Sequence, residues 1–440
     1  MIAHFLVRKN REKEQEGVME NNQTNEKRQD FELQAVPDSA RKGFLPMFMI
    51  MMGFTFFSAN MSAGGQLGVG LNMTKFICAL LIGNAILGVY TGILGYIGCK
   101  TGLTLDLMAR HAFGKKGSWL CSAIITFTQM GWFGVGIAMF SIPVAELTGI
   151  PVVVLVILAG GLMTASAYFG IKSLEIISWI AVPAVGILGC ISVGLGVSSM
   201  GGIDSLFAAE PQSPITLATA ITLVVGSFIS GGTTTPNYTR FAKTKKIAVI
   251  ATVIAFFVGN SLMFVFGAVG GSVTGQADIF YIMIAQGLAL PAIIVLGLNI
   301  WTTADNGLYS CGLGLSNITG YSKKKMVLVS GMIGIVASVW LYYNFTSWLT
   351  FMGYAIPPVG GVVITDYFMH QNRYQCINHH ERFHPFFRGQ ILHTTSAIQS
   401  PSDNCRKCKT TKCNCCKNRY PIAIGCRESG NCQFRTCICA

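Results

Sequence analysis

Three oxygen-bearing side chains recur at helical spacing within one long apolar run. Asn299, Thr302 and Thr303 occupy positions i, i+3 and i+4, so they share one face of a helix. Two hydroxyl oxygens and a backbone carbonyl, joined by carbonyls from an unwound neighbouring segment, would form an oxygen cage without a buried negative charge. Such a cage suits a hard monovalent cation, and sodium fits that description. The alternative is that both threonine hydroxyls bond carbonyls of their own helix.

A second group combines an aromatic ring with an amide. Gln129 and Trp132 lie one helical turn apart in an earlier apolar run and face the same way. This pair suits a planar, neutral ligand that both donates and accepts hydrogen bonds. Phe228, at the interruption of a later run, would cover the opposite ring face, and Ser227 with freed backbone atoms would bind the ligand's edge. The competing interpretation places Trp132 in helix packing or at the membrane interface.

Asp305 is a carboxylate inside an apolar run. An ionisable residue within the membrane is a functional candidate, including as a proton carrier. The competing interpretation is an internally hydrogen-bonded Asp near span ends or the amides of other helices. No hydrolase elbow, P-loop or zinc-protease motif occurs in the apolar runs, and His111 is the only histidine between Gly43 and Met369. The sequence therefore does not indicate an enzyme.

The composition is that of a membrane protein. The chain is 51% apolar and 12% charged, whereas roughly 25% of residues are charged in an ordinary soluble domain. The formal net charge of +13 is concentrated in residues 371–440 and in short loops between apolar runs. This distribution indicates orientation in a lipid bilayer, and it argues against a nucleic-acid partner.

Runs of about 20 apolar residues predict membrane-spanning helices. The sequence contains ten such runs, at approximately 44–69, 76–99, 118–145, 151–170, 175–199, 215–239, 247–271, 288–316, 326–343 and 346–369. Lys and Arg accumulate in cytoplasmic loops. The loops after runs two, four, six and eight contain twelve such residues, whereas the alternate loops contain one, Lys75. This alternation predicts that both termini are cytoplasmic.

Two of the predicted spans carry helix-breaking residues at matching positions. Span one contains the segment Gly53 to Asn60 and span six the segment Gly226 to Pro236, both rich in Gly and hydroxyl residues. Interrupted backbone survives at membrane depth where it lines a cavity or holds an ion, and paired interruptions point to a transporter with internal repeats. Because the two interruptions lie five spans apart, an odd number, the second repeat enters from the opposite face and is inverted. The alternative is that small residues merely permit close helix packing.

Several long motifs resemble those of the bacterial cytosine permeases of the nucleobase cation symporter family. They are Pro37 to Gly43, Gly53 to Ser58, Gln129 to Gly136, Val225 to Ser230, Leu298 to Thr303 and Ala355 to Gly361. The similarity runs from about Pro37 to Tyr374. It implies an all-α membrane protein with an inverted repeat of five plus five helices of the leucine-transporter type, in which helices 1 and 6 are broken.

The resemblance also implies a function and a site. The function is cytosine import across the bacterial inner membrane by symport with sodium, with no cofactor besides the coupling ion. Trp132 and Phe228 would sandwich the base, and Gln129 and Ser227 would hydrogen-bond it. The sodium ligands would be the backbone oxygens of Gly53, Phe56 and Asn299 and the hydroxyls of Thr302 and Thr303. The alternative is a proton-coupled permease for another nucleobase or a hydantoin-like ring, with Asp305 carrying the proton.

Three regions are expected along the chain: a polar cytoplasmic tail at 1–42, in which Met19 is an alternative start, a ten-span transporter core at 43–370, and a Cys-rich basic cytoplasmic tail at 371–440. Family members continue with two more membrane helices, which this chain replaces with the tail. Cys405 and Cys408 have the spacing of zinc ligands, so a membrane-anchored metal-binding protein is a rival function. The favoured interpretation of the tail is a disordered or frameshifted end. The sequence assigns no oligomeric state.

Overall fold

The computed structural model describes residues 31, 33–276, 278–344, 348, 352, 354–371 and 373–374. Within these residues the regular elements are helices, and a single isolated bridge joins Lys42 to Ala242. The predicted all-α class is therefore confirmed. Residues 1–30 and the Cys-rich segment, including the predicted zinc ligands, lie outside the described residues.

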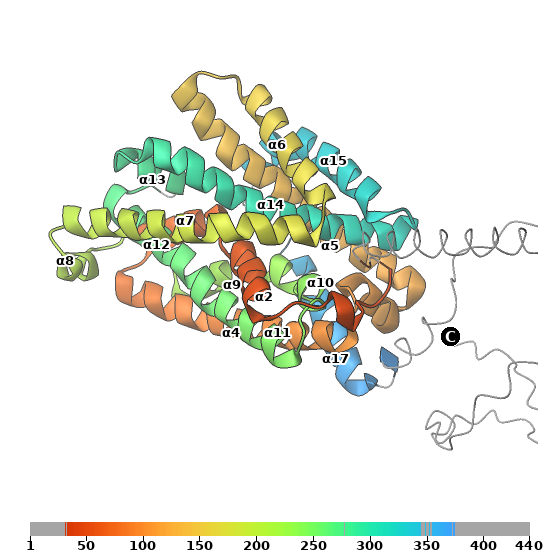
Figure 1. Cartoon of the computed structure of the whole chain (residues 1–440). Helices are drawn as coiled ribbons and strands as arrows, with labels where there is room; N and C mark the ends of the chain where they lie inside the picture. Colours follow the sequence, from red (N-terminus) through yellow and green to blue (C-terminus); the bar gives the residue numbers. More distant parts are fainter. Residues whose placement is uncertain are drawn as a thin grey trace, which may run out of the picture. The chain divides into compact units, whose positions relative to one another are not determined.

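The long helices fall on the predicted spans (Figure 1). They are α2 (Phe44–Thr55) with α3 (Ser58–Gly70), α4 (Met73–Thr101), α5 (Leu105–Thr148), α6 (Val152–Tyr168), α7 (Ile171–Ser199), α9 (Leu217–Thr233) with α10 (Pro236–Thr239), α11 (Lys245–Ile254) with α12 (Asn260–Thr274), α14 (Ala289–Thr319), α15 (Lys323–Tyr343) and α17 (Pro357–Met369). Two short helices, α8 (Ile203–Ala208) and α13 (Ile279–Ala285), lie in connections. Among the described residues, six helical segments and the bent pair α2 and α3 are long and apolar enough to cross a membrane. The protein is thus a multi-pass membrane protein.

The first interruption is a sharp bend between α2 and α3. Phe56 and Phe57 leave the helical region, with ψ angles of 92° and 126°, and the two helices meet at 51°. Carbonyls in the last turn of a helix lack i+4 donors, so the end of α2 presents backbone oxygens toward its neighbours. The interruption predicted between Gly53 and Asn60 is confirmed.

The interruption in span six is a tight turn. α9 ends at Thr233 and α10 restarts at Pro236, which occupies a position where its missing N–H is harmless. The amides of Thr234 and Thr235 donate to the carbonyls of Gly231 and Gly232 at 3.0 and 3.2 Å. The predicted break is therefore present, but Phe228 lies within the continuous helix α9 and not at the break as expected, because 3₁₀-type bonds keep the backbone paired up to Thr235.

A π-helical segment, η2 (Ala255–Gly259), joins α11 to α12. Such segments are rare in proteins as a whole, but those that occur often lie at functional sites. A Cβ atom at Gly259 would lie 2.6 Å from Thr55 Oγ1, so η2 packs tightly against the end of α2. The apolar pattern of this span does not distinguish a π-helical from an α-helical segment. The π-helical segment was therefore not predicted from the sequence.

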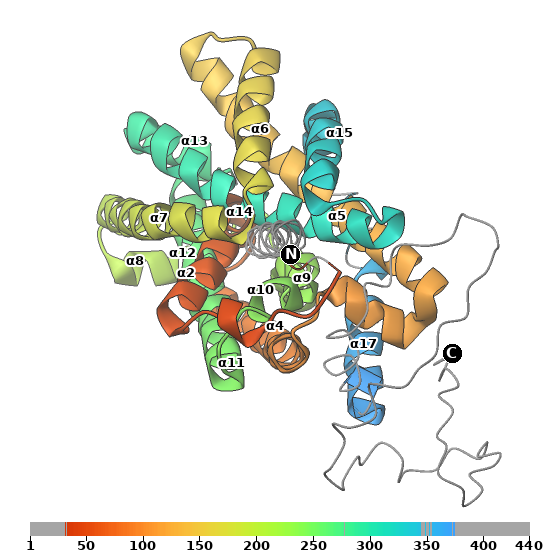
Figure 2. The same cartoon turned by 45° about the vertical axis from the view of Figure 1, so that its right-hand side comes forward.

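Helix α14 lies between α5 and α7 and contacts both (Figures 1 and 2). Helices α6 and α15 pack on one side of it, whereas α4, α11 and α17 lie on the other side of the helical unit, as Figure 2 shows. Close glycine packing joins α3 to α12: a Cβ at Gly68 would lie 2.1 Å from the carbonyl oxygen of Ala268, and one at Gly267 would lie 1.7 Å from that of Met61. Small residues at such crossings let helix backbones approach closely.

The segment before α2 packs onto the ends of the helices. The amide of Val36 donates to the carbonyl of Gly102 at 3.0 Å, and Arg41 Nη1 donates to the carbonyl of Cys99 at 2.9 Å. Lys42 forms an ion pair with Glu175 of α7. These contacts connect the start of α2 to α4 and α7.

Candidate functional site

The carbonyl of Phe56 is the point at which the first interruption meets α14. Asn299 Nδ2 donates to this oxygen at 2.8 Å and Thr303 Oγ1 donates to it at 3.2 Å. Asn299 is completely buried and Thr303 is nearly so. The carbonyl is accessible to α14 because the backbone turns out of the helix after Thr55. Two side chains that lie 243 and 247 positions after Phe56 in the sequence therefore meet at its carbonyl oxygen.

The carbonyl of Asn299 is a second shared oxygen. Thr302 Oγ1 donates to it at 2.8 Å and Thr303 Oγ1 lies 3.5 Å from it. The bond from Thr302 stays within its own helix, as one of the two sequence interpretations expected, while Thr303 also reaches across to α2. Four oxygens without formal charge thus gather between α2 and α14. Asn299 Oδ1 is buried and has no hydrogen-bond partner among the described residues.

Gly53 lies in the last turn of α2, next to this oxygen cluster. A Cβ atom at this position would lie 2.2 Å from Ser178 Oγ of α7. The absence of a side chain therefore lets α2 approach α7 closely just before the bend that presents the Phe56 carbonyl to α14. The five predicted sodium ligands lie on two elements, α2 with the residue after it and α14. Uncharged oxygen ligands of this kind fit a hard monovalent cation.

Trp132 of α5 is hydrogen-bonded to the sixth span. Its Nε1 donates to Ser230 Oγ at 2.8 Å, and Phe57 packs edge-to-face against its ring at a centroid distance of 5.4 Å. The indole therefore lies between the two interrupted spans. Ser227 was the serine predicted in this neighbourhood. Ser230 was not predicted, although it lies in the same polar segment one turn later on the same helix face.

Phe228 and Ser227 occupy the middle of α9. The Phe228 ring packs edge-to-face against Phe54 and Phe256, at centroid distances of 5.1 and 5.0 Å. Ser227 Oγ donates to the carbonyl of Val224 in its own helix at 3.0 Å. Phe228 is therefore held between α2 and η2, and the hydroxyl of Ser227 retains a lone pair for a further bond.

Gln129 lies where α5 faces α14. A Cβ at Gly307 would lie 3.3 Å from the Gln129 carbonyl oxygen and 3.7 Å from Gln129 Oε1, so α5 and α14 pack closely at this point. Gln129 is 2% exposed, and its Nε2 has no hydrogen-bond partner among the described residues. A buried amide nitrogen without an acceptor costs about 1–3 kcal/mol, which a bound ligand with an acceptor group would recover.

Asp305 is held by the neighbouring helix α6. Ser166 Oγ donates to Asp305 Oδ1 at 2.6 Å and accepts from Trp301 Nε1 at 2.7 Å. Asp305 Oδ2 has no hydrogen-bond partner among the described residues. The sequence did not identify Ser166 or Trp301 as partners, because only the packing of α6 against α14 brings them together.

The part of α14 that follows Asp305 is bonded to α10 and the residue after it. Tyr238 Oη donates to the carbonyl of Asn306 at 2.8 Å and lies 2.8 Å from Ser310 Oγ. Arg240 Nη2 donates to Tyr309 Oη at 2.9 Å, and the amide of Leu105 donates to Asn237 Oδ1 at the same distance. The second half of span six is thus tied to α14 and to the start of α5 through side chains.

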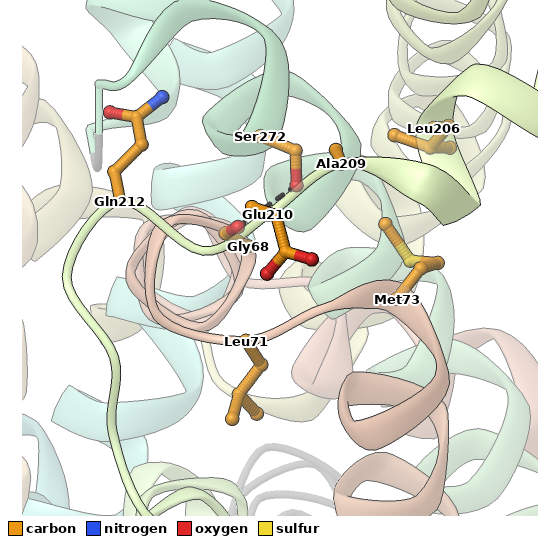
Figure 3. Close-up of a pocket in the computed structure, with 8 residues that line it drawn as sticks. All are labelled: Gly68, Leu71, Met73, Leu206, Ala209, Glu210, Gln212 and Ser272. Carbon is orange, nitrogen blue, oxygen red and sulfur yellow. Dashed lines mark hydrogen bonds between the residues drawn. The ribbon is translucent and has the colours of Figure 1, made fainter.

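A small pocket lies away from these residues, beyond the end of α3 (Figure 3). The chain after α8 borders it, where the amide of Gln212 donates to the carbonyl of Val69 at 2.9 Å. The Ser272 hydroxyl donates to the carbonyl of Gly68, as Figure 3 shows. The pocket holds about one water molecule, so it is too small for an organic ligand.

Comparison with known proteins identifies relatives over most of the chain. The cytosine permease of Escherichia coli is 56% identical over 340 residues, which cover 77% of this chain and 81% of the relative. The hydantoin permease of Microbacterium maritypicum is 24% identical over 342 residues, covering 71% and 70%. Both relatives are named as permeases.

Two solved structures share the fold. The nucleobase-cation-symport-1 transporter Mhp1, closed with bromovinylhydantoin bound, matches with a TM-score of 0.69 at 20% identity and covers 77% of this chain and 81% of its own. A sodium-coupled sialic acid symporter in a substrate-bound outward-open state matches with a TM-score of 0.61 at 15% identity, covering 76% and 80%. These matches show a shared transporter fold, and the inverted repeat predicted from the paired interruptions is consistent with it.

A family model described as permease for cytosine/purines, uracil, thiamine and allantoin matches residues 35–385. This match covers the long helices and every residue of the candidate site. Permeases move a solute without transforming it, so the expectation that the protein is not an enzyme is confirmed. By the extent of this match and the identity to the bacterial permease, the chain belongs to the family of cytosine and purine permeases.

Proposed function

We propose that this protein imports cytosine across the bacterial inner membrane by symport with sodium. The observation that carries the proposal is the shared Phe56 carbonyl, which accepts from both Asn299 and Thr303 at the bend between α2 and α3. The proposed sodium ligands are the carbonyls of Gly53, Phe56 and Asn299 and the hydroxyls of Thr302 and Thr303. The identity of 56% to a cytosine permease supports the choice of substrate.

The proposed base site lies on the other side of the same bend. Trp132 and Phe228 would enclose the ring of cytosine, and Gln129 and Ser227 would bond its polar edge. Phe57 links the two sites, because it follows the ligand Phe56 directly and packs against Trp132. A ring stacked on an aromatic pair gains about 0.5–1.5 kcal/mol beyond its buried area.

Coupling follows from this geometry. A cation bound between α2 and α14 would order the bend, and the ordered bend would position Phe57 against Trp132. Ion and base then favour each other's binding by an amount that is typically about 1–3 kcal/mol. One positive charge carried inward across about 100 mV supplies roughly 2.3 kcal/mol, so accumulation needs no ATP. Movement of spans one, two, six and seven against the others would alternate access to the site.

A second candidate is coupling to protons through Asp305, with another nucleobase or a hydantoin-like ring as substrate. The observation that favours it is the buried Asp305 Oδ2, which has no hydrogen-bond partner among the described residues. Protonation of this oxygen would remove a buried charge. The bond from Ser166 to Asp305 Oδ1 would hold the carboxyl in place in either state.

Uptake of labelled cytosine into cells or proteoliposomes, with sodium replaced by choline, separates the two candidates. We expect uptake to collapse without sodium, Thr303→Ala to raise the sodium concentration needed for half-maximal uptake at least tenfold, and Asp305→Asn to keep its sodium dependence. Undiminished uptake by the native protein without sodium would refute the sodium proposal. Loss of proton-driven uptake in Asp305→Asn would establish the second candidate.

The orientation and the tail are separate proposals. The excess of Lys and Arg in alternate loops supports cytoplasmic termini, and labelling of single introduced loop cysteines from each side would test it. We assign transport to the core at 43–370. Removal of the chain after Asn372 should therefore preserve uptake. If uptake vanished and bound zinc was lost with the tail, the metal-binding rival would replace this assignment.

A further inference from the structure

An apolar groove of about 320 Å³ runs along the outer surface of the helical unit, where α4 meets α11 and α17. Its lining residues are Gly88, Val89, Gly92, Ile93, Tyr96, Val249, Val253 and Phe368. Val89 is 66% exposed and Phe368 is 52% exposed. Exposed apolar side chains on a membrane-spanning surface face the acyl chains of lipids.

Two glycines produce the concave shape of the groove. At Gly88 the nearest neighbour of an added Cβ atom, Val253 Cγ1, would be 4.0 Å away, and at Gly92 Val253 Cγ2 would be 3.0 Å away. Side chains at both positions would therefore occupy the groove. The two residues are one turn apart and share a face of α4. The groove is a feature of this helix face and does not result from a loose contact between helices.

The groove ends at a tyrosine with a lysine on either side. The ammonium nitrogens of Lys100 and Lys245 lie 5.8 and 5.7 Å from the centre of the Tyr96 ring. Tyr96 is the last lining residue along α4, and Lys100 follows it by one helical turn. Tyr and Lys at this position are typical of the boundary between the apolar core of a bilayer and its headgroups.

Neither lysine forms an ion pair within the part of the chain that the structure describes. Lys100 Nζ has a weak bond to Gln371 Oε1 at 3.4 Å and lies 5.4 Å from the ring of Tyr367. The carboxylate of α17, Asp366, accepts from Tyr374 at 2.6 Å and pairs with His370. Two positive charges therefore lie at the mouth of an apolar groove, without a carboxylate partner among the residues that the structure describes.

We propose that this groove is a binding site for an anionic phospholipid. One acyl chain lies along Gly88 and Gly92, and the headgroup phosphate is held between Lys100 and Lys245. Basic pockets beside membrane helices on the cytoplasmic side bind acidic headgroups in this way, and the two lysines belong to the loops predicted to be cytoplasmic. The occupant is a lipid of the inner leaflet that contacts α4, α11 and α17 together.

Native mass spectrometry of the full chain in detergent tests the proposal, with phosphatidylglycerol and phosphatidylcholine of identical acyl chains added in equal amounts. We expect the native protein to retain phosphatidylglycerol preferentially. The double variant Lys100→Gln with Lys245→Gln should bind it roughly thirty-fold more weakly. Gly88→Leu should reduce binding of both lipids, because it fills the groove while meeting no atom closer than about 4 Å at its Cβ.

A matched control is the double variant Lys324→Gln with Lys325→Gln. These lysines also lie over tyrosine rings, at 5.0 Å from Tyr168 and 6.0 Å from Tyr321, but away from the groove. The control should retain phosphatidylglycerol as the native protein does. Equal losses in the two double variants would overturn the proposal, as would displacement of the lipid by inorganic phosphate alone. A native dimer that Gly88→Leu converts to a monomer would also overturn it, because the groove would then join two copies of the chain.

Discussion

The two interrupted spans occupy matching places in the repeats, yet they expose different atoms. After α2 the backbone turns through 51°, and the carbonyl of Phe56 accepts bonds from two side chains of α14. After α9 the amides of Thr234 and Thr235 remain bonded to the preceding turn. The first span contributes main-chain oxygens, whereas the sixth contributes side chains, from Ser230 to Trp132 and from Tyr238 to α14.

The proposed sodium site therefore takes main-chain oxygens from the first interruption, whereas the proposed base site takes side chains from the sixth span. Each proposed site also includes a helix of the other repeat, α14 for sodium and α5 for the base. Uncharged carbonyl oxygens suit a cation, because they supply partial negative charge without the desolvation cost of a carboxylate. Hydroxyl, amide and aromatic side chains suit an organic ring, whose edge needs donors and acceptors at defined positions. Inverted repeats thus share a topology without sharing a chemistry.

The largest effect is expected at the first interruption. Asn299→Leu keeps the branching and the number of side-chain heavy atoms but removes the donor to the Phe56 carbonyl and the unpartnered Asn299 Oδ1. A weakened buried acceptor costs about 1–3 kcal/mol, so the sodium concentration for half-maximal uptake should rise by up to roughly a hundredfold. Uptake measured over a sodium titration checks this, with the melting temperature as a control for folding. An unchanged sodium titration would place the ion elsewhere.

The two spans should also differ in their tolerance of an added methyl group. Gly53→Ala would place a Cβ 2.2 Å from Ser178 Oγ, whereas Gly226→Ala in α9 meets no atom within 4 Å. Overpacking costs typically about 1–3 kcal/mol, while alanine in an open helical position gains up to about 1 kcal/mol over glycine. Denaturant unfolding in detergent should show opposite shifts. Equal losses of stability would mean that both spans are packed alike.

Removing the Tyr238 hydroxyl should loosen the second half of span six. Tyr238→Phe deletes the bond to the Asn306 carbonyl and the contact with Ser310, at a cost of about 1–1.5 kcal/mol. Hydrogen exchange of the α10 amides should accelerate roughly tenfold. Tyr343→Phe, at a 72% exposed position, is the control and should leave exchange unchanged. Unaltered exchange in Tyr238→Phe would mean that α10 is held by its backbone.

The smallest effect is expected from substituting two serines of α9, Ser230 and Ser227, which should differ in their influence on cytosine uptake. Ser230→Ala removes the acceptor of Trp132 Nε1, which should raise the cytosine concentration for half-maximal uptake about fivefold while sodium dependence stays constant. Ser227→Ala removes a hydroxyl that bonds its own helix. If Ser227→Ala weakened cytosine uptake and Ser230→Ala did not, the base would lie against the residue that the sequence selected. A matching loss of sodium affinity in Ser230→Ala would contradict this assignment of the two sites.

Much of the fold could be predicted because membrane helices obey local rules. A run of about twenty apolar residues is long enough to span a bilayer. The paired breaks at Phe56 and Thr234 could be predicted from the glycine and hydroxyl residues in each segment. The face shared by Asn299 and Thr303 follows from helical periodicity alone. The tightness of the sixth turn and the π segment at Ala255–Gly259 were not predictable, because they depend on single backbone bonds that composition does not encode.

The sequence by itself determined the long apolar helices, the alternation of charge between their loops, the two interruptions and the polar residues within the apolar runs. The tertiary structure alone decided the partners: Ser230 for Trp132, Ser166 for Asp305, and the Phe56 carbonyl for both Asn299 and Thr303. The physical reason is the range of the forces involved. Hydropathy and helical periodicity act within a segment, whereas a hydrogen bond forms only between atoms about 3 Å apart, and that distance is set by how separate helices pack.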